Sequence, residues 1–343
     1  MKHQIDLKNY QIHTDLAIEN IDKFKNNIDI DRVEKKYKDI KITSIYINTV
    51  NSLKLDKKIG NYITIEFTDC TDYDNCNNLK EVVNKELLEL MNINKININD
   101  SCMIIGLGNE KSTPDSLGPL VLDNIIVTNH LFDLGSVDKD FRKTYAFEPG
   151  VMAETGIETS DLLKNIIKDI KPGFIIVVDS LASGSINRLN KTIQITDTGI
   201  NPGSGVGNNR KEISKEVMGI PVIAIGVPTV VDAVTIVSDA IEYIYKNYAY
   251  MKNNKDNPKN KLLLSTQINY LEKDYEITSY EKRQLLGMIG NLDDNEIKEL
   301  IYEVLTPIGY NLMVTPKEID FIIEKLANII SDSINISLHK KLQ

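Results

Sequence analysis

The chain has few of the residues that build disulfide or zinc sites. It holds three cysteines and four histidines among 343 residues. The three cysteines cannot all pair, and their spacing fits no zinc pattern, so a disulfide-stapled secreted fold is not expected. Three of the histidines lie outside the part of the chain where strand and helix patterns alternate, and His130 follows a helix. The sequence therefore implies no metal or other cofactor and favours a reducing compartment.

Long hydrophobic runs and an excess of basic residues are also missing. No run approaches the length that crosses a bilayer, and the first six residues lack the apolar core of a signal peptide. The formal net charge of -9 argues against direct binding to nucleic acid, but leaves open a basic or nucleic-acid-associated protein as partner. We therefore expect a cytoplasmic protein with no membrane partner.

Strand and helix patterns alternate through the middle of the chain. Three apolar runs have the composition of strands buried in a parallel sheet: 102–107, 174–178 and 221–225. Three amphipathic patterns predict helices that follow or separate them: 117–125, 160–170 and 232–245. This alternation predicts an α/β fold with a mostly parallel central sheet flanked by helices, its core spanning about 100–247.

The segments before this core carry mixed signals. Apolar and polar residues alternate over 40–47 and over 61–67, which predicts two half-exposed strands. The charged stretch 31–39 has a helical pattern instead.

Two further regions depart from the alternating core. Segment 192–196 alternates like a strand and is followed by a Gly-rich loop, so we interpret about 185–215 as a smaller inserted hairpin lobe. The region from about 260 to 343 reads as helical. Within it, Thr315-Pro316-Lys317-Glu318 has the sequence of a capping box that opens the last helix.

Two aspartates stand where an α/β sheet places its catalytic groups. Asp115 lies in the loop Gly106–Pro119 after the first buried strand, and Asp179 ends the second. Ligands gather beyond the carboxyl ends of parallel strands, so the two side chains would face each other if the strands are neighbours. Two close carboxylates tend to share a proton, which provides one base to activate water and one acid to protonate a leaving group. Such a pair hydrolyses peptides without a Ser, Cys or metal.

Each aspartate also has a simpler interpretation. An Asp just before a helix is often its N-cap, so Asp115 could cap the helix that follows and have no catalytic role. An Asp at the end of a strand often only orders a loop. A carboxylate-only site for a hard cation also stays open.

Three other motifs carry weaker signals. Asp197-Thr198-Gly199 spells the triplet of pepsin-like proteases, but those are all-β proteins with two copies, so a turn is the better interpretation. Gly203–Gly207 lacks the lysine and helix start of a phosphate loop. The loop 148–156 precedes a helix and could line a substrate cleft. We assign its Glu154 and Thr155, together with Ser180, to substrate binding.

Six long motifs occur in a characteristic order: 10–19, 106–119, 149–158, 178–182, 196–208 and 225–231. Together they resemble the germination protease family of spore-forming bacteria, atypical aspartic-type endopeptidases. The resemblance implies that the enzyme degrades the small acid-soluble proteins that coat DNA in the forespore and spore core. It also implies a homotetrameric zymogen activated by removal of an N-terminal propeptide. The family's proposed catalytic aspartates fall on Asp115 and Asp179.

The same resemblance suggests a fold like that of the hydrogenase-maturation proteases. Their Gly-x-Gly-Asn loop is echoed in Gly106-Leu107-Gly108-Asn109. Those enzymes use a metal held partly by a histidine, and no matching histidine is evident here. Two alternatives stay open: a metal-dependent maturation-type peptidase that uses the same carboxylates, and a non-enzymatic module that binds spore proteins.

The N-terminal segment contains a candidate cleavage site. The family cleaves after an acidic residue that precedes an apolar residue and an alanine, and Thr14–Glu19 has this form. We therefore predict self-cleavage between Asp15 and Leu16, which removes a propeptide of residues 1–15 and leaves a protease domain of 16–343. The simpler interpretation is that Asp15 is a helix cap or a solvated charge.

Overall fold

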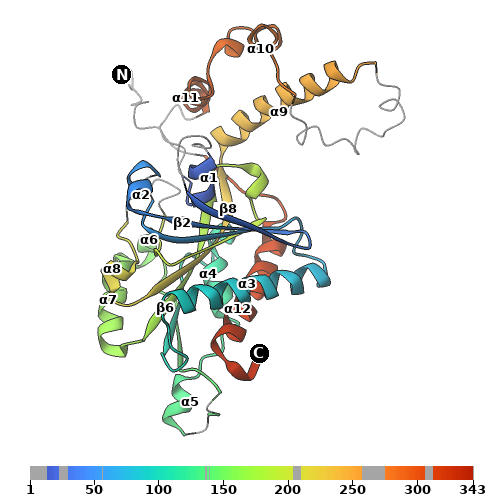
Figure 1. The fold of residues 1–343 in the computed structure, drawn as a ribbon. Helices are drawn as coiled ribbons and strands as arrows, with labels where there is room; N and C mark the ends of the chain where they lie inside the picture. Colours follow the sequence, from blue (N-terminus) through green and yellow to red (C-terminus); the bar gives the residue numbers. More distant parts are fainter. Residues whose placement is uncertain are drawn as a thin grey trace. The chain divides into compact units, whose positions relative to one another are not determined.

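The computed structural model describes residues 14–22, 30–55, 57–135, 137–138, 140–203, 210–256, 275–305 and 312–342 (Figure 1). The chain divides into two compact units. Of the described residues, those within 14–230 and 315–342 belong to the larger unit, and those within 231–314 belong to the smaller.

The larger unit is built on a mixed sheet. Its strands, in spatial order, are β1 (Asp31–Tyr37), β2 (Ile40–Ile47), β3 (Gly60–Glu66), β7 (Thr192–Thr196), β8 (Val222–Asp232), β6 (Phe174–Ser183), β4 (Cys102–Gly106) and β5 (Thr144–Phe147). Strand β4 runs parallel to β5 and β6. The pairs from β1 through β3 and β7 to β8 are antiparallel.

The prediction of a mostly parallel sheet is therefore wrong, although the α/β class with flanking helices is confirmed. Strands β2 and β3 do not form a separate structure. They extend the sheet through β7 as an antiparallel half. The prediction that they are half-exposed is wrong for β3, because its residues 62–65 are all buried, with Ile63 and Tyr62 in cores on opposite faces of the sheet.

Helices cover both faces of the sheet (Figure 1). Successive residues of a strand point to opposite faces. On β4, Ile104 belongs to the core under α3 (Tyr73–Ile93), α4 (Leu117–Leu122) and α12 (Ile319–Leu338). Its neighbour Met103 belongs to the core under α7 (Thr159–Ile170) and α8 (Lys215–Met218). Further along the sheet, α1 (Ala17–Asp22) and α2 (Thr49–Leu55) share a core with β2 and β3.

Three local predictions differ from the structure. Residues 31–37 form the edge strand β1 and not a helix, because pairing along the whole length of β2 outweighs the local pattern. Segment 192–196, which we placed in an inserted lobe, is β7 and lies inside the sheet. No capping box opens α12. Its N-cap is Glu318 without a side-chain cap, and the Thr315 hydroxyl donates to the Thr229 carbonyl at 2.8 Å.

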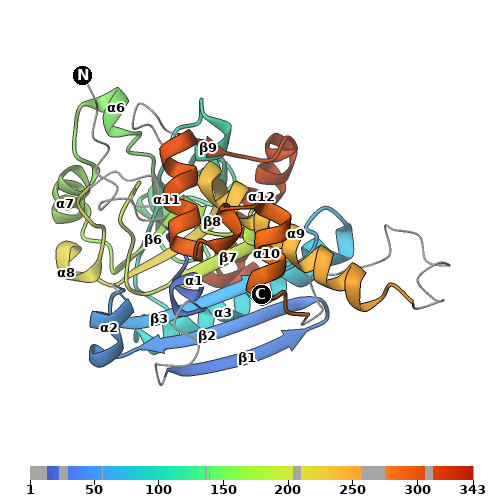
Figure 2. The ribbon, with the colours of Figure 1, turned by 90° about the horizontal axis from the view of Figure 1, so that it is seen from above.

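The smaller unit is helical. It contains α9 (Ala233–Asn253), α10 (Ser279–Leu286), α11 (Asp294–Leu305) and the short strand β9 (Met313–Val314), which pairs with the last two residues of β8 (Figure 2). Val234 on α9 packs against Ile297 and Ile301 on α11. The region predicted as helical from about 260 onward is thus divided, with α12 in the larger unit. Within the described ranges, no helix is long and apolar enough to cross a membrane.

Candidate active site

The loop that carries Asp115 begins where two backbones touch. A Cβ atom on Gly118 would lie 2.2 Å from the main-chain oxygen of Leu107, and one on Gly106 would lie 2.4 Å from the oxygen of Gly118. Only glycine permits this approach of strand β4 and helix α4. The residues between them are therefore forced into a compact loop at the end of the strand.

A main-chain hydrogen bond keeps Asp115 close to the end of β4. Asp115 ends a short 3₁₀ turn, Thr113–Asp115, and its carbonyl accepts the Asn109 amide at 2.9 Å. Gly108 lies beneath it with φ of +116°, a conformation that favours glycine. The N-cap position of α4 belongs to Ser116 and not to Asp115. The capping interpretation of Asp115 is therefore wrong.

Asp179 reaches the same place from the neighbouring strand. Strands β4 and β6 are parallel neighbours with Gly106 opposite Val178, and the Leu107 amide donates to the Val178 carbonyl at 2.8 Å. The loop thus leaves β4 beside Asp179, whose side chain is 5% exposed. The two strands are adjacent, which is the condition for the two carboxylates to meet.

Burial dominates the electrostatics of both aspartates. It raises the pKa of Asp115 to about 6, against the opposing charge of Arg210. Burial also raises the pKa of Asp179 well above its usual range, and the negative charges of Asp115 and Asp15 add to this shift. Burial thus raises the pKa of both carboxyl groups, and their environments differ, which is a pattern typical of groups that act as acid and base.

This electrostatic arrangement predicts that Asp115→Asn is more stable than the wild type above pH 6. The folded pKa of about 6 exceeds the ordinary 3.8, so the folded protein holds a proton that the unfolded chain releases. Stability is therefore lost as pH rises through 6. Removing the ionising group should restore about 1–2 kcal/mol at pH 8, after discounting for partial exposure, and little at pH 4. Urea unfolding at the two pH values measures this, and an equal effect at both would contradict it.

The predicted cleavage sequence lies along the end of β6. The Asp15 amide donates to the Ala182 carbonyl at 3.1 Å, and the Ala182 amide donates to Asp15 Oδ2 at 2.8 Å. Leu16 packs on Leu181, which shares a face of β6 with Asp179 because alternate residues of a strand point the same way. Ala182 is three residues beyond Asp179, about 10 Å along the strand. The structure thus brings Asp15 and Leu16 to the side of the sheet that Asp179 faces.

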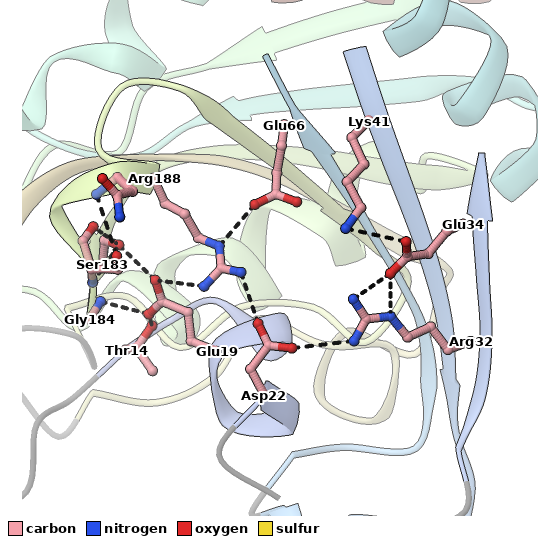
Figure 3. A network of polar contacts seen from close by, with 12 residues as sticks. Thr14, Glu19, Asp22, Arg32, Glu34, Lys41, Glu66, Ser183, Gly184 and Arg188 are labelled. Carbon is pink, nitrogen blue, oxygen red and sulfur yellow. Dashed lines mark hydrogen bonds and ion pairs between the residues drawn. The ribbon is translucent and has the colours of Figure 1, made fainter. Parts of the chain in front are cut away.

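A buried ion-pair network holds the residues that follow this sequence (Figure 3). The Glu19 carboxylate accepts Ser183 Oγ at 2.8 Å, the Gly184 amide at 2.6 Å and the Thr14 hydroxyl. Arg188 lies 3.6 Å from Glu19 and bonds to Asp22 at 2.9 Å. The segment from Thr14 to Asp22 is therefore anchored on both sides of Leu16.

The structure places the three predicted substrate-binding residues differently. Glu154 is exposed and pairs with Lys111, in the loop of Asp115, at 3.3 Å. The Thr155 hydroxyl donates to the Val151 carbonyl at 3.2 Å, which completes its own short helix, α6 (Met152–Thr155). The Ser180 hydroxyl oxygen is buried, and the main-chain amide of Ser180 donates to Asp179 Oδ1 at 2.9 Å. Of these three residues, Ser180 is therefore the one that is bonded directly to an aspartate of the pair.

Sequence reasoning missed Arg210, which follows a Gly-rich loop and whose charge acts on both Asp115 and Asp179. It also missed Arg188, which pairs with Glu19 and Asp22. Lys57 and Gln194, which bind the Asp15 carbonyl, belong to no motif either. By contrast, Asp197 of the Asp-Thr-Gly triplet accepts the Asn61 amide at 2.8 Å, a structural role. No group of three potential metal ligands occurs within the described part of the chain.

Similarity to known proteins decides the family. The germination protease family model matches residues 7–343. The chain belongs to the germination protease family. A germination protease of Priestia megaterium is 45% identical over 363 residues, which covers 100% of this chain and 97% of the relative. Germination proteases of Bacillus cereus and Bacillus velezensis are each 44% identical, over 100% and 99% of this chain and 97% and 96% of theirs.

Family membership makes the chain a peptidase and confirms the resemblance drawn from its motifs. Asp115 and Asp179 are carboxyl groups with raised pKa values, and the charge of Asp15, in the candidate cleavage sequence, acts on Asp179. Their catalytic role, the substrate-binding residues and the likeness to hydrogenase-maturation proteases stay predictions.

Proposed function

We propose that this germination protease is an endopeptidase that begins the degradation of small acid-soluble, DNA-binding spore proteins during germination. The single observation that supports it best is that Asp115, in the loop after β4, and Asp179, within the neighbouring parallel strand β6, both have a raised pKa. Strand β6 continues to Ser183, so the prediction that Asp179 ends its strand is wrong. We also propose that it works as a homotetramer in the forespore and spore core and does not itself bind DNA.

The two aspartates have different roles in the proposed reaction. Asp115 is partly exposed and its pKa is about 6, so its carboxylate takes a proton from water at neutral pH as that water adds to the peptide carbonyl carbon. Asp179 is buried, and its raised pKa favours the protonated form. It donates this proton to the leaving nitrogen as the carbon–nitrogen bond breaks. Arg210 lies close enough to both groups to limit the rise in their pKa values.

We further propose that the protein is made as a zymogen and cleaves itself after Asp15. The support is the position of Asp15, which is hydrogen-bonded to Ala182 and whose charge acts on Asp179. Residues on the carboxyl side of the Asp15–Leu16 peptide bond are buried, with Leu16 at 0% and Ile18 at 1% exposed. Cleavage would therefore release residues 1–15 and leave the rest of the segment in the core.

Self-cleavage predicts a defined product. Purified precursor held at mildly acidic pH, near 6, should lose residues 1–15 and acquire Leu16 as its first residue, because Asp115 is then still partly ionised while the raised pKa of Asp179 favours its protonated form. Mass spectrometry of the intact protein measures this. The Asp115→Asn precursor is the control, since a contaminating protease would process it equally. Loss of a different segment, or equal processing of the control, would refute the proposal.

Two alternative functions can be separated from this one. A metal-dependent peptidase would stop cleaving a Thr-Asp-Leu-Ala-Ile-Glu peptide after chelation, whereas the aspartate mechanism continues. A non-enzymatic binding module would retain spore protein without cleaving it. Family membership favours the peptidase.

A further inference from the structure

The carbonyl group of Asp15 is held by two side-chain donors. Its oxygen accepts Lys57 Nζ at 3.2 Å and Gln194 Nε2 at 3.2 Å. One donor is a cation from the end of the α2 region, and the other is an amide from β7. Neither was identified from the sequence, and their separation from Asp15 along the chain is 42 and 179 residues.

Gln194 also fixes the residue beyond the bond. Its Oε1 accepts the Ala17 amide at 2.8 Å, so one side-chain amide spans Leu16 and binds the main chain on both sides of it. Gln194 is 6% exposed, and Leu16 packs beneath on Leu181 and Ile18. This amide therefore has a fixed orientation, with its N–H group directed at the Asp15 oxygen.

The nitrogen of the same peptide bond is also bound. The Leu16 amide donates to Thr14 Oγ1 at 3.1 Å, and the Thr14 hydroxyl donates to Glu19. Lys57 Nζ contacts the Thr14 carbonyl as well, at 3.3 Å. Both polar atoms of the Asp15–Leu16 bond are thus bound by side chains.

We propose that Lys57 and Gln194 are the donors that stabilise the oxyanion when the Asp15–Leu16 bond is hydrolysed. This inference rests on the proposed self-cleavage. When water adds to the Asp15 carbonyl carbon, the base takes a proton from the water and the π electrons move to the carbonyl oxygen. The negative charge then lies against the Lys57 ammonium and the Gln194 amide. The electrons return as the bond to Leu16 nitrogen breaks, and the acid protonates that nitrogen. Donors aimed at a developing oxyanion are among the largest contributions to catalysis.

Four variants of the full-length precursor test this role. Lys57→Met removes the donor at similar length, and Lys57→Arg keeps a cation. Gln194→Glu keeps an oxygen for the Ala17 amide but replaces the N–H group that faces Asp15. Lys58→Met is the matched control, because the neighbouring Lys58 directs its ammonium group to the Glu212 carboxylate. The rate constant of self-cleavage is followed by mass spectrometry, with thermal unfolding of each variant in parallel.

Lys57→Met and Gln194→Glu should each slow cleavage about 100- to 1000-fold, the usual effect of losing one oxyanion donor. Lys57→Arg should recover most of the rate, and Lys58→Met should cleave like the wild type. A Lys57→Met precursor that cleaves at the wild-type rate would overturn the donor role and leave the aspartate mechanism standing. Equal slowing by Lys58→Met would overturn it too. A wild type that never cleaves between Asp15 and Leu16 would overturn this inference together with self-cleavage.

Discussion

Replacing Asp115 or Asp179 with asparagine is expected to abolish peptide cleavage while the protein stays folded. Asparagine has the shape of aspartate but exchanges no proton, so each change should lower the rate by about 100- to 10,000-fold. The double variant should be little worse than either single variant, because the two groups act as one unit. Initial rates on a Thr-Asp-Leu-Ala-Ile-Glu peptide measure both effects.

The control for this experiment is a surface aspartate. Asp332 on α12 pairs with Lys80 on α3 at 2.6 Å, and neither residue contacts the aspartate pair, so Asp332→Asn should cleave at the wild-type rate. Wild-type activity in both Asp115→Asn and Asp179→Asn would contradict the aspartate mechanism. If only one variant is inactive, the reaction has a single carboxyl catalyst and not a pair.

Replacing Arg188 with methionine should destabilise the larger unit by about 3–5 kcal/mol, the usual cost of removing one partner from a buried ion pair. Burial alone would lower the pKa of Arg188, but the charges of Glu19 and Glu66 and its hydrogen bonds to Asp22 and Glu66 raise it instead. The Glu19 side chain is only 5% exposed. Without Arg188, it would be left as a buried charge without a cation. Urea unfolding of the precursor measures the loss.

Arg32 provides a matched comparison in the same network (Figure 3). Its side chain is 30% exposed and pairs with Asp22 at 3.3 Å and with Glu34. Exposed pairs contribute little, so Arg32→Met should cost about 1 kcal/mol or less. Adding Glu19→Gln to Arg188→Met should recover part of the lost stability, because it removes the buried negative charge of Glu19 that no longer has a cation beside it. Equal costs for the two arginine variants would show that burial of Glu19 is not the cause.

The sequence by itself determined the strands of the sheet's centre and the two aspartates. Continuous apolar runs identify β4 and β6 because a strand covered on both faces has no polar side. A polar residue that ends such a run marks where the continuous apolar pattern stops, and Asp179 and the loop of Asp115 were located in this way. The structure differs in one respect, because β6 continues past Asp179 to Ser183.

Only the tertiary structure decided how the antiparallel half of the sheet forms and what holds the segment around Asp15. The charged edge strand β1 looked helical because its pairing partner was not visible in its own pattern, and β7 looked like an insertion because its neighbour β3 is distant in sequence. Arg188 reaches Asp22 across 166 residues, and Gln194 reaches Asp15 across 179. Periodicity records only which face of an element is apolar. A hydrogen bond between residues so far apart depends on how the whole sheet brings its strands together, and no local pattern contains that.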